Sequence, residues 1–112
     1  MPIANCIVSP RCYENAVRPA DLIQLWAHES GKSPDAMTVN IVLSTEQFGN
    51  PYDIMANLFL PSLWSKQDVA LLQTGLAKAL AGYFGVPVSS VFVMTSILDS
   101  GQVVENGEQV VW

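Results

Sequence analysis

The pattern of apolar and polar positions predicts a strand, a helix and a second strand in the first part of the chain. Ile3 to Val8 is almost continuously apolar, which is typical of a buried strand. Apolar residues from Leu22 to Ala27 recur at helical spacing after Pro19, which can occupy the first turn of a helix. Gly31 can end that helix in a left-handed conformation, and Met37 to Leu43 alternates as a second strand does.

The rest of the chain repeats this order. Ile54 to Leu63 is a third extended apolar stretch. Ser65 and Asp68 have the spacing of a capping box, which predicts that a helix begins there. The inner face of that helix is apolar at helical spacing: Val69, Leu72, Leu76, Leu80 and Phe84. Gly85 can end it, and the residues around Val91 indicate a fourth strand.

Three further segments indicate turns. The Pro-containing stretch Ser9–Arg11 predicts a break after the first strand, and Gln47–Asp53 reads as a loop. Val103–Val111 predicts a β-hairpin, because its central pair Asn106-Gly107 is favoured in two-residue type I′ turns.

These elements predict a single α+β domain over residues 1–112. It consists of two βαβ pseudo-repeats, at about 1–50 and 54–98, followed by a C-terminal hairpin at 102–112. Right-handed crossovers place both helices on one face of a four-stranded mixed sheet. The other face is then bare and apolar, so we expect a partner chain to cover it.

Composition supports self-association. Half of the residues are apolar and only 13% are charged, which is little polar cover for a chain of 112 residues. No apolar run approaches the roughly 20 residues that a membrane span needs. No basic segment followed by an apolar one precedes the first strand, so we expect no signal peptide.

Charge and cysteine content narrow the possible partners. The net charge is −5 and the five cations do not cluster, which argues against nucleic-acid or anionic-membrane binding. Cys6 and Cys12 lie too far apart in an extended segment to form a bridge, so free thiols in a reducing cytoplasm are expected. One histidine and two separated cysteines make no zinc pattern, and we expect neither a metal nor a cofactor.

Three segments resemble the tautomerase superfamily. Met1-Pro2-Ile3-Ala4 resembles the start of 4-oxalocrotonate tautomerase, Ser30-Gly31-Lys32-Ser33-Pro34 a segment of macrophage migration inhibitory factor, and Val103-Val104-Glu105-Asn106-Gly107 the tail of cis-3-chloroacrylic acid dehalogenase. The resemblance implies a homotrimer with three sites near the amino ends of the chains. It also implies a catalytic N-terminal proline, exposed when Met1 is removed, that acts on small-molecule carbonyl compounds or unsaturated acids.

Pro2 has a physical reason to serve as a general base. An ordinary α-amino group titrates near pH ~7.7–8.0, and an apolar pocket lowers that pKa by disfavouring the ammonium form. A neutral amine can then remove a proton next to a carbonyl. The alternative is a proline that only begins a strand, and Pro2 remains an amide while Met1 is attached.

Four polar residues are candidates for assisting Pro2. The resemblance implies that Glu105 holds a water, that Lys32 pairs with an anionic substrate group, and that His28 contacts substrate. Arg11 is one position off the register of an arginine in 4-oxalocrotonate tautomerase. The alternatives are a solvated hairpin glutamate, a lysine or histidine favoured by a helix dipole, and a solvated loop arginine.

Four apolar residues are expected in the pocket wall: Ile3, Ile7, Leu63 and Phe92. Leu63, Phe92 and Met94 are expected to contact substrate. Phe92 and Met94 stand where relatives place polar residues, and neither offers a comparable hydrogen bond. The paired arginines of the dehalogenase are also missing before the second predicted helix. A less charged substrate, or weak activity, follows from these departures.

Three functions remain open. The first is a tautomerase or isomerase that uses Pro2 on small keto-enol acids. The second is a hydratase or dehalogenase of unsaturated acids that uses Pro2 with Glu105. The third is a non-catalytic trimer, a binding or structural protein that keeps the fold.

Overall fold

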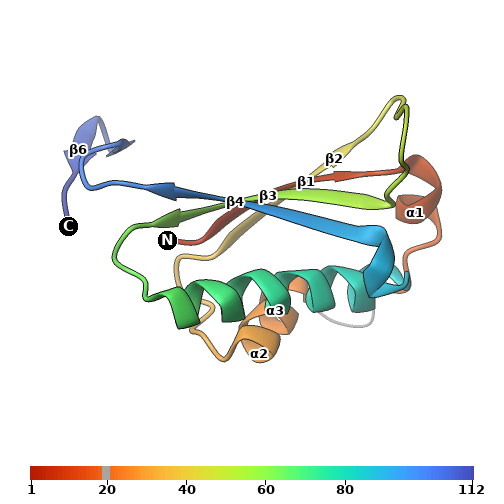
Figure 1. The fold of residues 1–112 in the computed structure, drawn as a ribbon, viewed down its shortest axis with the longest axis horizontal. Coiled ribbons are helices and arrows are strands. Elements are labelled where there is room, and N and C mark those ends of the chain that lie inside the picture. The colour runs from red at the N-terminus through yellow and green to blue at the C-terminus, as the bar shows by residue number, and fades with distance from the viewer. Residues whose placement is uncertain (19–20) are drawn as a thin grey trace.

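A four-stranded mixed sheet forms the centre of the molecule (Figure 1). The structure is a computed structural model that describes residues 1–18 and 21–112. The strand order is β2–β1–β3–β4, with β1 parallel to β2, antiparallel to β3, and β3 parallel to β4. The strands are β1 (Ile3–Val8), β2 (Thr38–Leu43), β3 (Ile54–Pro61) and β4 (Val91–Leu98). The mixed sheet expected from the sequence is confirmed.

Two helices cover one face of this sheet, as the βαβ pattern predicts (Figure 1). They are α2 (Leu22–Ser30) and α3 (Lys66–Phe84). The smaller elements are a short helix α1 (Pro10–Glu14), a 3₁₀ turn η1 (Val88–Ser90), and the hairpin strands β5 (Val103–Glu105) and β6 (Glu108–Val110). Within the described ranges, none of these helices has the length and apolar content that crossing a bilayer requires.

Local capping sets the helix boundaries. The Asp21 carboxylate accepts a hydrogen bond from the Ile23 backbone N–H at 2.8 Å and so begins α2, while the prediction for Pro19 lies outside the described residues. Ser65 Oγ accepts from the Asp68 backbone N–H at 3.1 Å, which is one half of the predicted capping box.

The predicted break at Ser9–Arg11 is a helix in the structure. Ser9 Oγ accepts from the Cys12 N–H at 3.2 Å, and Pro10 occupies the first helical position, where its missing N–H costs nothing. The predicted break is confirmed, because β1 ends at Val8, but the sequence pattern did not predict the short helix that follows.

Strand alternation divides the sheet into a covered and a bare face. In β1, Ala4, Cys6 and Val8 are fully buried against the helices. The helical layer contributes the largest buried ring, Trp26, whose Nε1–H donates to the Leu72 carbonyl at 3.0 Å. This hydrogen bond ties α2 to α3 inside the core.

The opposite sheet face carries a polar row beside an apolar row. Asn5 lies opposite Asn40 and Asn57 in register, and Asn40 Nδ2 donates to Asn5 Oδ1 at 2.8 Å. Ile7, Val42, Met55 and Phe92 form the neighbouring row, with Ile7 and Val42 42% and 54% exposed. Large apolar side chains therefore lie uncovered on this face.

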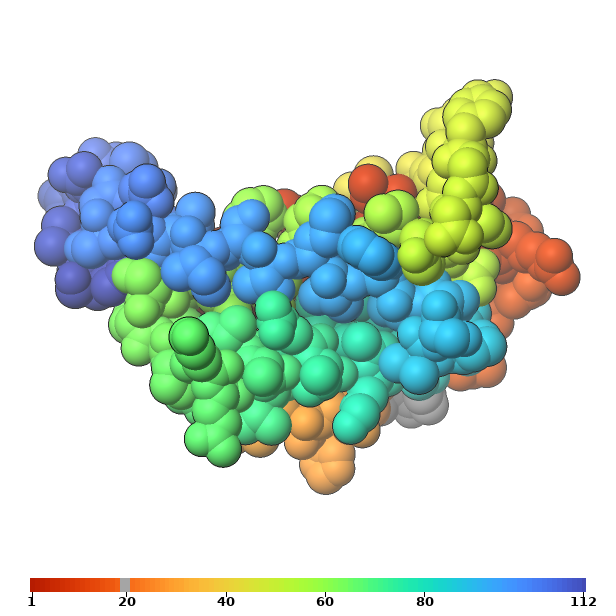
Figure 2. All heavy atoms as spheres, in the orientation of Figure 1, coloured from red at the N-terminus to blue at the C-terminus, as the bar shows by residue number. Residues whose placement is uncertain are grey.

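Two segments project from opposite ends of the sheet on its bare side (Figure 2). One is the β2–β3 connection, coloured yellow, and the other is the C-terminal hairpin, coloured blue. Asn106 and Gly107 have φ of 54° and 75°, and a type I′ turn requires positive φ at both positions. The hairpin predicted from this dipeptide is confirmed.

Candidate functional site

The topology brings several predicted site segments to the end of the sheet where the chain begins. Pro2 is buried, and its carbonyl accepts a hydrogen bond from the Thr38 N–H at 3.0 Å. Ile3 pairs with Phe59 near the end of β3, and β4 runs parallel to β3. Three further segments therefore lie at this end of the sheet: the start of α3, the α2–β2 connection and the hairpin (Figure 1).

The amino terminus lies within electrostatic reach of Glu105. Burial lowers the pKa of the Met1 amino group below its ordinary value, and the negative charge of Glu105 opposes that effect. A charge that raises the pKa of the N-terminal amine must lie close to it. The structure therefore brings Glu105, which is exposed in the hairpin, toward the beginning of the chain.

Lys32 is held in an ion pair that the sequence does not reveal. Its Nζ donates a hydrogen bond to Asp68 Oδ1, and the two side chains are 22% and 33% exposed. The hydrogen bond from Lys32 holds the pKa of the Asp68 carboxyl below its usual range. Lys32 Nζ also lies 5.8 Å from the centre of the Trp64 ring, within range of a cation–π contact.

The β3–α3 connection contains Leu63 and Trp64, and Trp112 packs against it. Leu63 is 60% exposed, as a pocket-wall residue is expected to be. The C-terminal Trp112 donates from Nε1 to Ser62 Oγ at 3.0 Å and from its backbone N–H to Ser100 Oγ at 2.8 Å. The tail therefore folds back onto its own chain. Trp64 Nε1 is buried, with no hydrogen-bond partner among the described residues.

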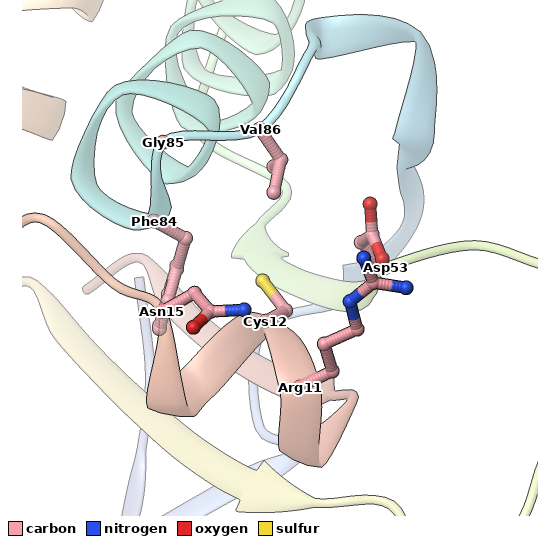
Figure 3. Close-up of a pocket in the computed structure, with 7 residues that line it drawn as sticks. All are labelled: Arg11, Cys12, Asn15, Asp53, Phe84, Gly85 and Val86. Carbon is pink, nitrogen blue, oxygen red and sulfur yellow. The ribbon is translucent and has the colours of Figure 1, made fainter.

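Arg11 lies at the other end of β1 and does not meet Pro2 within one chain. It follows the carboxyl end of β1 in α1, whereas Pro2 precedes the amino end of β1. Arg11 lines a cavity of about 360 Å³ together with Cys12, Asn15, Asp53, Phe84, Gly85 and Val86 (Figure 3). This cavity is thus remote from the chemistry proposed for the amino terminus.

The cavity holds no activated nucleophile. Figure 3 shows the Cys12 sulfur directed into the space between α1 and the end of α3. Burial, assisted by the negative charge of Asp53, raises the pKa of the Cys12 thiol. The thiol therefore stays protonated near neutral pH, and Cys6 and Cys12 are both free, as the sequence predicts.

Phe92 also lies away from Pro2 within one chain. It pairs in register with Met55, which lies opposite Ile7 near the far end of β1. Its ring centre is 5.0 Å from that of Tyr52. The reason is topological: β4 begins at the end of the sheet opposite to the one where β1 begins.

Met94 lies in the middle of the sheet, and His28 lies near the end of α2. Met94 pairs with Asn57 in the middle of the bare face and is exposed. His28 is exposed in the last turn of α2, a position that a helix dipole favours for a histidine. Neither side chain has a hydrogen bond with Pro2, Lys32 or Glu105 in the described structure.

Sequence reasoning missed the role of Asp68 beyond helix capping. The capping-box spacing identified this residue, but its ion pair joins positions separated by 36 residues. A weak signal was available: when the two βαβ units run antiparallel, the start of one helix, which carries a carboxylate, and the end of the other, followed by a lysine, meet at one end of the sheet. Within the described ranges, no three metal-binding side chains gather into a site.

Solved structures of other proteins match nearly the whole of this chain. A scan against protein-family models and a search of curated proteins found no match. A fused 4-OT in its asymmetric trimer matches with a TM-score of 0.72 and 11% identity, covering 96% of this chain and 94% of that chain.

Two other solved structures match over similar lengths. The N1 protein, a member of the cis-3-chloroacrylic acid dehalogenase family, gives a TM-score of 0.72 at 11% identity, covering 96% of this chain and 82% of that chain. Macrophage migration inhibitory factor from Toxoplasma gondii gives 0.60 at 14% identity, with 96% and 98% covered. The chain therefore has the fold of the tautomerase superfamily, as the sequence resemblance predicts.

Proposed function

We propose that the protein is a tautomerase or isomerase that uses the Pro2 amine as a general base once Met1 is removed. One observation carries the proposal: the beginning of the chain is buried at one end of the sheet, and burial lowers the pKa of an amine there. A neutral secondary amine at that position can accept a proton near neutral pH.

The proposed reaction is an isomerisation and needs no co-reactant. The Pro2 nitrogen accepts the hydroxyl proton of an enol as its C=O bond forms. The C=C electron pair takes a proton at carbon, which the ammonium form of Pro2 returns. Substrates are small keto-enol compounds, of which keto-enol acids are the class that the sequence resemblance implies.

Mass spectrometry of the untagged protein tests the first requirement. Loss of Met1 exposes the amine, whereas complete retention leaves an amide and favours a non-catalytic binding or structural protein. Ketonisation of phenylenolpyruvate is then measured for the wild type and for Pro2→Ala. We expect a large loss of rate in the variant, and equal rates would remove Pro2 from the mechanism.

A second function is supported by the proximity of Glu105 to the amino terminus. A carboxylate there can orient and deprotonate a water that adds to an unsaturated acid, while Pro2 protonates the other carbon. On a 3-haloacrylate, the resulting halohydrin loses hydrogen halide and gives an aldehyde. Halide release should vanish in Glu105→Gln but persist in Glu108→Gln, which removes the other exposed glutamate of the same hairpin. Equal release by both variants contradicts this role.

We also propose that the active form is a homotrimer. The bare sheet face exposes large apolar side chains, and the fused 4-OT that shares this fold forms a trimer. Covering that face with two further copies would bury those side chains. Sedimentation velocity of the untagged protein measures the assembly directly, and a monomer at micromolar concentration would contradict it.

A further inference from the structure

The end of the sheet at Pro2 has one partly buried cation. The chain has five cations, which are Arg11, Arg18, Lys32, Lys66 and Lys78. Arg11 lies at the opposite end of β1, and Arg18 stacks over Tyr13 at 4.5 Å and donates to the Tyr13 carbonyl at 3.4 Å. Lys78 is exposed in the middle of α3, and Lys66, which begins α3 at the Pro2 end, is also exposed to solvent. Lys32 is thus the partly buried cation at the Pro2 end, and its charge is engaged by Asp68.

Both members of the Lys32–Asp68 pair are fixed by helix termini. Lys32 follows Gly31, the left-handed residue that ends α2, and its N–H donates to the Ala27 carbonyl at 3.2 Å and to Ser30 Oγ at 3.3 Å. Asp68 lies in the first turn of α3, where its N–H donates to Ser65 Oγ. The backbones therefore hold the two side chains together without help from a ligand.

The remaining charges near the amino terminus are unfavourable for an anionic substrate. Glu105 lies close enough to affect the N-terminal amine, and an acidic side chain repels a carboxylate. The ring of Trp64 lies beside Lys32, and Leu63, which precedes Trp64 in the sequence, is an exposed apolar side chain. A carboxylate bound here would have to compete with Asp68 for Lys32.

We propose that Asp68 determines the substrate charge at this site: by engaging Lys32 it makes the site select uncharged keto-enol compounds, such as aryl ketones and esters, over keto acids. The inference rests on the proposed function of Pro2 and specifies its substrate class. Asp68 is a specificity-determining residue and takes no part in proton transfer. Removing its charge leaves Lys32 free to bind a substrate carboxylate.

A pair of substrates that differ by one charge tests this directly. Ketonisation of phenylenolpyruvate and of its methyl ester is measured for the wild type, Asp68→Asn, Asp68→Glu and Asp35→Asn. Asp35 is an exposed carboxylate of the α2–β2 connection, so its variant removes the same charge without releasing Lys32. The wild type should prefer the ester. Asp68→Asn should raise kcat/KM for the acid relative to the ester about tenfold, mainly through KM.

The controls separate this effect from general charge or instability. Asp68→Glu and Asp35→Asn should keep the wild-type preference, and Lys32→Met added to Asp68→Asn should cancel the gain. An unchanged acid-to-ester ratio in Asp68→Asn overturns the inference while leaving Pro2 catalysis intact. A wild type that prefers the acid and loses that preference in Arg11→Ala also overturns it, because another cation then binds the carboxylate.

If no variant turns over either substrate, the proposed function is overturned. A binding measurement still tests the inference in that case. NMR titration with phenylacetate and phenylacetamide then compares an anion with its neutral counterpart. The wild type should bind the amide more tightly, and Asp68→Asn should gain affinity for phenylacetate by about tenfold, or about 1.4 kcal/mol. No gain for phenylacetate overturns the inference.

Discussion

Gly75 allows α2 and α3 to approach more closely than any side chain would permit. A Cβ added at Gly75 would lie 2.8 Å from the backbone nitrogen of Ser30 and 2.9 Å from its Cα. These are backbone atoms of α2 and cannot rotate away as a flexible side chain can. Gly75→Ala must therefore push the two helices apart. Gly82, in the same helix, has no atom within 4 Å of an added Cβ and provides a matched control.

The two substitutions should change stability in opposite directions. Replacing a helical glycine by alanine stabilises a helix by about 0.8–1 kcal/mol, which is the full expectation for Gly82→Ala. At Gly75 the same gain is opposed by overpacking, which typically costs about 1–3 kcal/mol, and by loosening of the buried contacts around Ser30. We expect Gly75→Ala to lower the free energy of unfolding by about 1–2 kcal/mol. Because Lys32 follows Ser30 closely, its pairing with Asp68 should weaken as well.

Urea unfolding followed by circular dichroism measures both variants, at one fixed protein concentration because assembly would couple to stability. A stabilised Gly75→Ala, equal to Gly82→Ala, would refute the close helix approach. A loss of stability in both variants would refute the reasoning differently, because it would mean that the exposed site at Gly82 is also constrained.

Further predictions concern the core, the bare sheet face and the far end of the sheet. Burial raises the pKa of the Cys6 thiol to about 12, so the unfolded chain releases this proton first and stability should fall by about 1.4 kcal/mol per pH unit above pH ~9. Cys6→Val should reduce that slope in urea titrations made at several pH values and leave the contribution of Cys12, whose pKa is also raised. Ile7→Lys places a charge on the bare face and should dissociate the oligomer in sedimentation experiments, and unchanged sedimentation would contradict the proposed assembly. If Arg11 assists Pro2 from another subunit, inactive Pro2→Ala and Arg11→Ala proteins should regain activity when refolded together, and no recovery would contradict a shared site.

Local sequence rules were sufficient for most of the fold. Gly31 and Gly85 both end helices with φ of 70° and 67°, which is the conformation for which glycine was expected at those positions. Asn106-Gly107 forms the predicted hairpin turn for the same kind of reason. Such features depend on a few neighbouring residues, so they can be read without knowing the tertiary structure.

The candidate site was harder to predict because it depends on contacts between distant segments. The ion pair of Lys32 with Asp68 depends on how α2 and α3 pack, which no local pattern specifies. Phe92 was expected near Pro2 from a resemblance between aligned positions, but an alignment does not say at which end of the sheet a strand begins. The register of β3 with β1 and β4 decides this and places Phe92 at the far end.

The separation of the two sheet ends limits what a single chain can do. β1 has six residues between Pro2 and the segment that carries Arg11, and a strand rises about 3.3 Å per residue, so the two ends are roughly 20 Å apart. No small substrate spans that distance. Arg11 and Phe92 can therefore influence chemistry at Pro2 only if another copy presents its far end to the amino terminus of this one. Within one chain, Lys32 pairs with Asp68 beside Trp64 at this end of the sheet, and Glu105 lies within electrostatic reach of the amino terminus, so the two carboxylates outnumber the one partly buried cation. A further cation presented by another copy would favour anionic substrates, whereas the pairing of Lys32 with Asp68 is the basis on which we propose selection of uncharged ones.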